Sequence, residues 1–74
     1  MNAIKSIRTT VFGVTQVEFA VIAGVKQSTV SRWENGVAPT LDEMRTIRQA
    51  ALDRAIEWKD EWFFDSRSEL QATG

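Results

Sequence analysis

The sequence predicts an all-α fold, a small bundle of four to five helices, and three observations lead to this prediction. Residues 15–18 and 40–43 both have the Thr-x-x-Glu spacing of a capping box, which marks a helix N-terminus. Gly24 and Gly36 each follow a stretch with helical periodicity, and glycine commonly ends helices. Residues 41–64 contain neither Gly nor Pro, and their apolar residues recur at three- and four-residue steps.

Length and composition exclude several classes of function. With 74 residues the chain has room for one domain, and chains of this size bury only about 60 % of their unfolded surface. The absence of Cys excludes disulfides and thiolate metal sites, and the absence of His removes the usual neutral metal ligand and general base. We therefore expect that the protein is not an enzyme and that it binds no cofactor, metal or small-molecule ligand. Without a long apolar run, we expect neither a signal peptide nor a membrane span, and we place the protein in the cytoplasm.

Charge is distributed unevenly along the chain. Residues 1–48 have a formal charge of +2 and residues 49–74 of −3, which together give the net charge of −1. This asymmetry is compatible with an N-terminal part that faces an anionic partner and a C-terminal part that is turned away from it.

The first helix is predicted over residues 3–12, because Ile4, Ile7 and Val11 follow helical spacing, and residues 12–14 close it. A second helix begins after Thr15 and stops at Gly24.

After a short turn, a third helix fits residues 27–34, and Asn35 with Gly36 supplies its left-handed stop. At 100° per residue, Val30 and Trp33 fall on one side and should anchor the helix. Its other side is a polar arc formed by Gln27, Ser28, Ser31, Arg32 and Asn35. Any surface helix has a polar face, so the arc alone does not identify a binding site.

The spacing of the second and third helices is more specific. Two helices that cross steeply need a small residue at the contact, here Ala20, and a glycine in the turn, here Gly24. These two positions belong to a longer pattern, formed by Thr15-Gln16, Phe19-Ala20, Gly24-Val25 and Val30-Ser31-Arg32-Trp33-Glu34-Asn35-Gly36. With this pattern the chain resembles the lambda-repressor/Cro-like (Xre-type) family over residues 4–51. The resemblance implies a lambda-repressor-like helix-turn-helix bundle that regulates transcription.

By this resemblance we expect the protein to repress a bacterial or phage promoter and to bind the major groove of a two-fold double-stranded DNA operator as a homodimer. Gln16 should bond a phosphate beside a helix N-terminus, and Gln27, Ser28 and Arg32 should face base edges. The expected DNA contacts are Thr15, Gln16, Lys26, Gln27, Ser28, Ser31, Arg32 and Asn35. The alternative is a protein-interaction module of the antitoxin or anti-repressor type.

The sequence does not show whether Arg8 and Glu34 form an ion pair. Relatives often have a basic residue one position later than Arg8, paired with the acid at the place of Glu34, but that position here is Thr9. Either Arg8 bends round to Glu34 or the pair is absent.

The C-terminal part allows two interpretations. Residues 40–64 form one long helix, or the helix breaks near Leu52 and Asp53 caps a fifth helix. We expect residues 1–52 to form the DNA-binding domain, residues 53–66 an extended C-terminal helix that dimerises, and residues 67–74 a disordered tail.

Three large aromatics, Trp58, Trp62 and Phe63, stand in the most acidic part of the chain and need a partner surface. We expect that surface to be the same helix of a second chain. The alternative partner is the chain's own second helix, where Val17 and Val21 lie one turn apart on a face that is otherwise polar in the family. Both valines could also be ordinary exposed residues.

Overall fold

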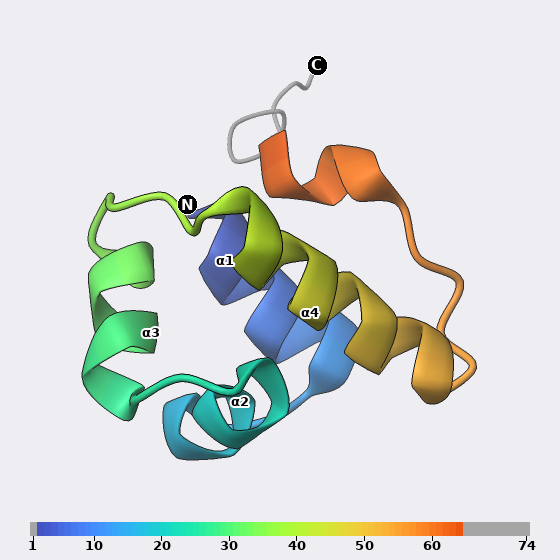
Figure 1. Ribbon diagram of the computed structural model, residues 1–74, viewed down its shortest axis with the longest axis horizontal. Coiled ribbons are helices and arrows are strands. Elements are labelled where there is room, and N and C mark those ends of the chain that lie inside the picture. The colour runs from blue at the N-terminus through green and yellow to red at the C-terminus, as the bar shows by residue number, and fades with distance from the viewer. Residues whose placement is uncertain (1, 65–74) are drawn as a thin grey trace.

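The computed structural model describes residues 2–64, and these form a helical bundle with no β-strand among them (Figure 1). The all-α prediction is confirmed. The elements in order are α1 (Ala3–Ser6), the π-helix η1 (Ile7–Phe12), α2 (Gln16–Ala23), α3 (Gln27–Glu34), α4 (Leu41–Asp53) and the 3-10 helix η2 (Asp60–Phe64). The tail predicted over residues 67–74 lies outside the described residues.

The first helix begins at Asn2, whose side chain accepts hydrogen bonds from the backbone N–H groups of Ile4 and Lys5. It changes from α to π winding at Ile7, so its hydrogen bonds then reach five residues back instead of four. Gly13, at φ +66°, ends the helix and donates its N–H to the Arg8 carbonyl. The helix predicted over residues 3–12 is confirmed, although its second half is wound differently from an ordinary α-helix.

The core lies where the first helix, α2, α3 and α4 meet. Its largest fully buried side chains are Phe19, Ile7, Ile47 and Val30, which come from four different elements. The ring of Phe19 packs between Phe12, at 5.4 Å between centroids, and Trp33, at 6.4 Å. Burial of these apolar side chains is the main stabilising term for a domain of this size.

Helix α4 starts as predicted and ends earlier than the extended C-terminal helix that we expected. Thr40 and Glu43 form a complete capping box at its N-terminus. At its other end Ala55 takes a left-handed conformation, φ +60°, and the Ile56 N–H donates to the Ala51 carbonyl at 3.0 Å. Residues 40–64 therefore do not form one helix, and Asp53 ends α4 without capping another α-helix.

The residues after α4, the C-terminal segment (residues 54–64), turn back over the bundle and pack beside α1 (Figure 1). There Trp58, Trp62 and Phe63 contact the chain's own core. The ring centroids of Trp62 and Phe63 lie 5.1 Å and 5.2 Å from that of Trp58. A continuous helix would carry these rings away from the core at about 1.5 Å per residue. Each ring can bury about 150 to 250 Å², which outweighs the cost of a left-handed alanine, about 1 to 2 kcal/mol.

Candidate nucleic-acid interface

The helix-turn-helix unit (residues 16–34) consists of α2, a tight turn and α3. The Thr15 hydroxyl accepts from the Glu18 N–H, and the Glu18 carboxylate accepts from the Thr15 N–H, so the predicted capping box is confirmed. Gly24 ends α2 at φ +72°, and the next residue, Val25, donates its N–H to the Ala20 carbonyl at 2.9 Å. These local bonds set the angle at which α3 leaves α2.

Helix α3 is held from one side only. Val30 and Trp33 are buried, as predicted, and they fix the helix on the core. The opposite side is accessible along the whole helix: Ser31 is half-buried, and Lys26, Gln27, Ser28, Arg32 and Asn35 are exposed. An exposed polar face on a rigid helix is the arrangement that a DNA major groove can accept.

The eight expected DNA contacts lie at two adjacent places, the start of α2 and the outer side of α3. Gln16 and Gln27 are joined directly, because Gln27 Nε2 donates to Gln16 Oε1 at 2.8 Å. Asn35 is used differently, since its amide donates to the Ser31 carbonyl of its own helix at 2.8 Å. Lys26 occupies the N-cap of α3 and makes no side-chain cap bond there.

A hydrogen-bond chain links this surface to the interior. Arg8 Nε and Nη2 donate to the two carboxylate oxygens of Glu34 at 2.6 Å and 3.2 Å, and Gln16 Nε2 donates to Glu34 Oε1 at 3.0 Å. The side chains of Arg8 and Glu34 are only 13 % and 7 % exposed. The hydrogen-bond chain therefore runs from a partly buried ion pair through Gln16 to Gln27 on the surface.

The Arg8–Glu34 pair settles the alternative that the sequence left open. The π-helical stretch η1 contains one more residue than an α-helical turn of the same span. Counted back from Thr15, this extra residue brings Arg8 to the place where an α-helix would put residue 9. The unusual winding and the unusual position of the arginine are thus one feature, which sequence spacing alone does not show.

The ion pair also determines the charge of Glu34. Burial alone would raise the pKa of Glu34, but hydrogen bonds from Arg8 and Gln16 and the positive charges of Arg8 and Lys5 more than offset this effect. The pKa of Glu34 consequently lies below its ordinary value, and the carboxylate is ionised at neutral pH.

An ionised Glu34 fixes the orientation of both glutamine amides. A carboxylate can only accept hydrogen bonds, so the Gln16 amide nitrogen must face Glu34 and its oxygen must face Gln27. Gln27 then gives one N–H to Gln16 and keeps its oxygen and its other N–H for a partner. Arg8 and Glu34 are not among the site residues predicted from the sequence, and the signal that could have suggested them is the shifted position of the arginine.

The aromatic residues expected at a dimer interface lie away from this surface. In Figure 1 the C-terminal segment and α2 are on opposite sides of the bundle, with α1 and α4 between them. Trp58, Trp62 and Phe63 are half-buried against the core. They do not cover Val17 and Val21, which remain 60 % and 78 % exposed.

Residues 2–64 contain no group of three or more acidic side chains that could hold a metal ion. None of the described helices is both long and apolar enough to cross a bilayer.

Comparison with known proteins agrees with this geometry. A family model described as helix-turn-helix matches residues 4–54, which is more than half of the chain. No curated protein and no solved structure matches the chain. The matched residues include the capping box of α2, the turn at Gly24, all of α3 and α4, and they support the resemblance seen in the sequence. The chain belongs to the Cro/C1-type, Xre-like helix-turn-helix family of DNA-binding regulators.

Proposed function

We propose that the chain is a sequence-specific repressor of a bacterial or phage promoter, acting in the cytoplasm as a dimer on a two-fold operator. Residues 1–52 would bind DNA, and the C-terminal segment, which Trp58, Trp62 and Phe63 attach to the bundle, would present the surface that joins the two copies. Occupancy of the promoter is sufficient to exclude polymerase, so no catalytic step is required.

The observation that carries this proposal is the fixed orientation of the Gln27 amide. Its free oxygen and free N–H match the N6 donor and N7 acceptor that adenine presents in the major groove. Guanine presents two acceptors there and would require two donors, one of which Gln27 already gives to Gln16. We therefore assign Gln27 to an adenine in each half-site.

The other surface residues complete the proposed contact. Arg32 is exposed on the same side of α3 and suits the two acceptors of guanine, and Ser28 can bond either kind of base edge. Gln16 and Thr15 lie at the positive N-terminal end of α2, where a phosphate is favoured. Lys26, Ser31 and Asn35 flank these residues and would contact the DNA backbone or assist the base contacts.

Selection of bound sequences from a random DNA pool tests the assignment. The wild-type protein should select a two-fold site with one adenine position per half-site that Gln27→Ala no longer selects. Lys26→Ala is the control, because loss of a contact to the DNA backbone should lower affinity for all sequences alike. Gln16→Ala would not serve, since it also frees the Gln27 amide. An unchanged adenine preference in Gln27→Ala would contradict the proposal.

A second candidate function rests on Val17 and Val21. These neighbouring valines on α2 are well exposed and could bind another protein, as an antitoxin or anti-repressor would. A band shift with genomic fragments at low salt separates the candidates, since phosphate contacts are strongest there. A retarded band supports the repressor, and its absence supports the interaction module.

A further inference from the structure

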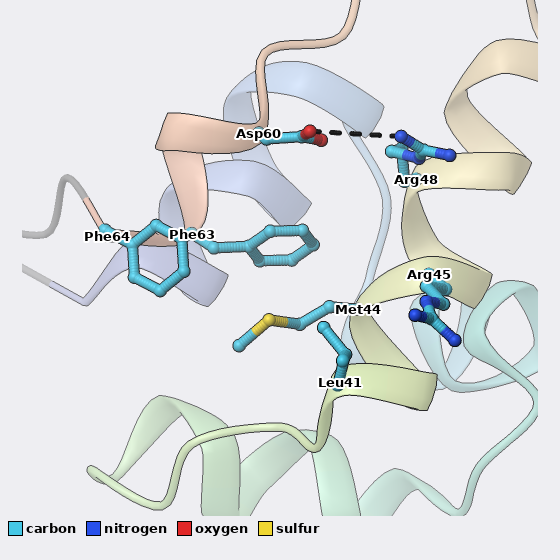
Figure 2. A pocket seen from close by; sticks show the side chains of 7 residues that line it. All are labelled: Leu41, Met44, Arg45, Arg48, Asp60, Phe63 and Phe64. Carbon is cyan, nitrogen blue, oxygen red and sulfur yellow. Dashed lines mark ion pairs between the residues drawn. The ribbon is translucent and has the colours of Figure 1, made fainter.

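A groove opens between the first turns of α4 and the 3-10 helix η2. It has a volume of about 440 Å³, and its lining residues are Leu41, Met44, Arg45, Arg48, Asp60, Phe63 and Phe64. Figure 2 shows Phe63 pointing across it toward Met44, and Phe64 standing at its outer edge. The floor is apolar, and two arginines on α4 form one wall.

The apolar surface extends beyond the groove. A smaller hollow of about 180 Å³ shares Met44, Phe63 and Phe64 with it and continues to Val37 in the loop before α4. Phe64, Leu41 and Val37 are 70 %, 63 % and 55 % exposed. Exposed apolar residues that gather around a groove indicate a surface that binds a partner.

We propose that a second copy of this chain occupies this groove, with Phe64 of each protomer inserted into the groove of the other. The proposal rests on the dimer proposed above and identifies its contact surface. A two-fold interface must be self-complementary, because the same patch meets itself. This patch satisfies that condition, since it contains both a projecting ring, Phe64, and a groove beside it that can receive such a ring.

Charge complementarity also favours a second copy. Arg45 and Arg48 are only loosely paired, with Asp42 at 3.7 Å and Asp60 at 3.9 Å. Among residues 2–64, Glu61 on η2 is exposed and makes no ion pair. We expect a second copy to bring this carboxylate to Arg45, the more exposed of the two arginines, whose side chain is 69 % exposed against 48 % for Arg48.

The size of the patch predicts how strongly the copies associate. Phe64 can bury about 150 to 250 Å², and Leu41 and Val37 add less than that each. The patch thus falls short of the roughly 800 Å² that each partner contributes to a standard interface. We expect a weak dimer in solution that the two half-sites of an operator stabilise.

The test measures association of the full chain by sedimentation, free and on a two-half-site duplex. Phe64→Ala should weaken dimerisation at least tenfold, whereas Leu52→Ala, which truncates another exposed apolar residue, should leave it unchanged. Arg45→Glu and Glu61→Arg should each weaken self-association, and an equimolar mixture of the two variants should restore a dimer. In that mixed dimer one Arg45–Glu61 contact is native and the other is re-formed with reversed sign.

Binding to a single half-site duplex and thermal unfolding show whether each variant is folded and still binds DNA. Retained half-site binding with lost dimerisation supports the proposal. Three results would overturn it: a chain that is monomeric both free and on the operator, a dimer that Phe64→Ala leaves intact, or a variant mixture that stays monomeric. Loss of DNA binding in the wild type would instead contradict the proposed function, whatever the sedimentation shows.

Discussion

The helix-turn-helix unit and the C-terminal segment both bury aromatic side chains, but they are held in place by different forces. In the helix-turn-helix unit, local bonds define each end of α2: a capping box at Thr15 and a left-handed glycine at Gly24. In the C-terminal segment the turn is made by Ala55, a residue that disfavours its own conformation. Tertiary packing of Trp58 and Trp62 has to supply what local structure does not.

The two regions suit the two roles that we propose, which are DNA binding for the helix-turn-helix unit and dimerisation for the C-terminal segment. A surface that reads bases must hold its side chains in one geometry, and the partly buried Arg8–Glu34 pair gives Gln16 and Gln27 that geometry. A surface that joins two copies weakly can tolerate a segment that is attached mainly through packing. Substitutions in either region can test this separation.

Removing Glu34 should damage the helix-turn-helix unit most. Glu34→Ala leaves the partly buried Arg8 without its carboxylate. Loss of one partner from a fully buried pair typically costs about 3 to 5 kcal/mol and an exposed pair contributes about 1 kcal/mol or less, so we expect a loss of about 2 to 3 kcal/mol here. The free energy of unfolding from urea titration measures this loss. Glu34→Gln is the control, because it keeps the shape and an acceptor oxygen and should cost less. A loss below about 1 kcal/mol for Glu34→Ala would mean that the pair is solvated and does not organise the surface.

Acid should weaken the same pair. Because the folded-state pKa of Glu34 is lowered, the pair contributes stability above the unfolded-state pKa of about 4.3 and loses it as pH falls through the folded value. Wild-type stability should therefore drop more steeply below about pH 4 than that of Glu34→Gln, in which this residue does not titrate. Parallel pH profiles of the two proteins would contradict the assignment.

Arg32→Ala should affect DNA binding without affecting the fold, because its side chain is exposed and unused in packing. We expect a loss of about 1 to 3 kcal/mol on the preferred site and a relaxed preference at one base pair per half-site. Titration of specific and random duplexes at fixed salt measures both. An equal loss on both duplexes would make Arg32 a phosphate contact.

The sequence was sufficient to predict the elements that local signals define. The two capping boxes placed the starts of α2 and α4, Gly24 placed the end of α2, and α3 has the predicted bounds. The end of α4 could not be predicted in the same way. No Gly or Pro stands near Asp53, and the break depends on how much aromatic surface the returning segment buries against the core.

The residues on the surface of the candidate site could be predicted from the sequence, but the hydrogen bonds that connect them could not. Helical periodicity put Gln27, Ser28 and Arg32 on one side of α3, where the structure has them exposed. The bonds from Glu34 to Gln16 and on to Gln27 span 18 and 11 residues along the chain and depend on the angle between two helices. The π winding of η1, which brings Arg8 to Glu34, has no recognisable signal in its six residues.

Gly24→Val should destabilise the helix-turn-helix unit by about 1 to 2 kcal/mol, since a β-branched residue is strained at φ +72°. The effect is conformational, because a Cβ added at this position would meet no other atom within 4 Å. Gly24→Asn is the control, since asparagine tolerates the left-handed region and should cost less. Equal melting temperatures for the wild type and Gly24→Val would mean that the turn is not left-handed.

Ala55→Gly is the complementary change in the C-terminal segment, and it should stabilise the protein. Glycine removes the steric cost of φ +60° but loses more backbone entropy on folding, so the expected net gain is about 1 kcal/mol or less. Ala38→Gly is the matched control: Ala38 is an exposed loop alanine without positive φ, so only the entropy loss applies and stability should fall. Chemical denaturation followed by tryptophan fluorescence reports on both variants, because Trp58 and Trp62 lie in the segment that Ala55 turns back onto the bundle. A loss of stability in Ala55→Gly would mean that this turn is not strained, and that the two regions are held by the same kind of local structure.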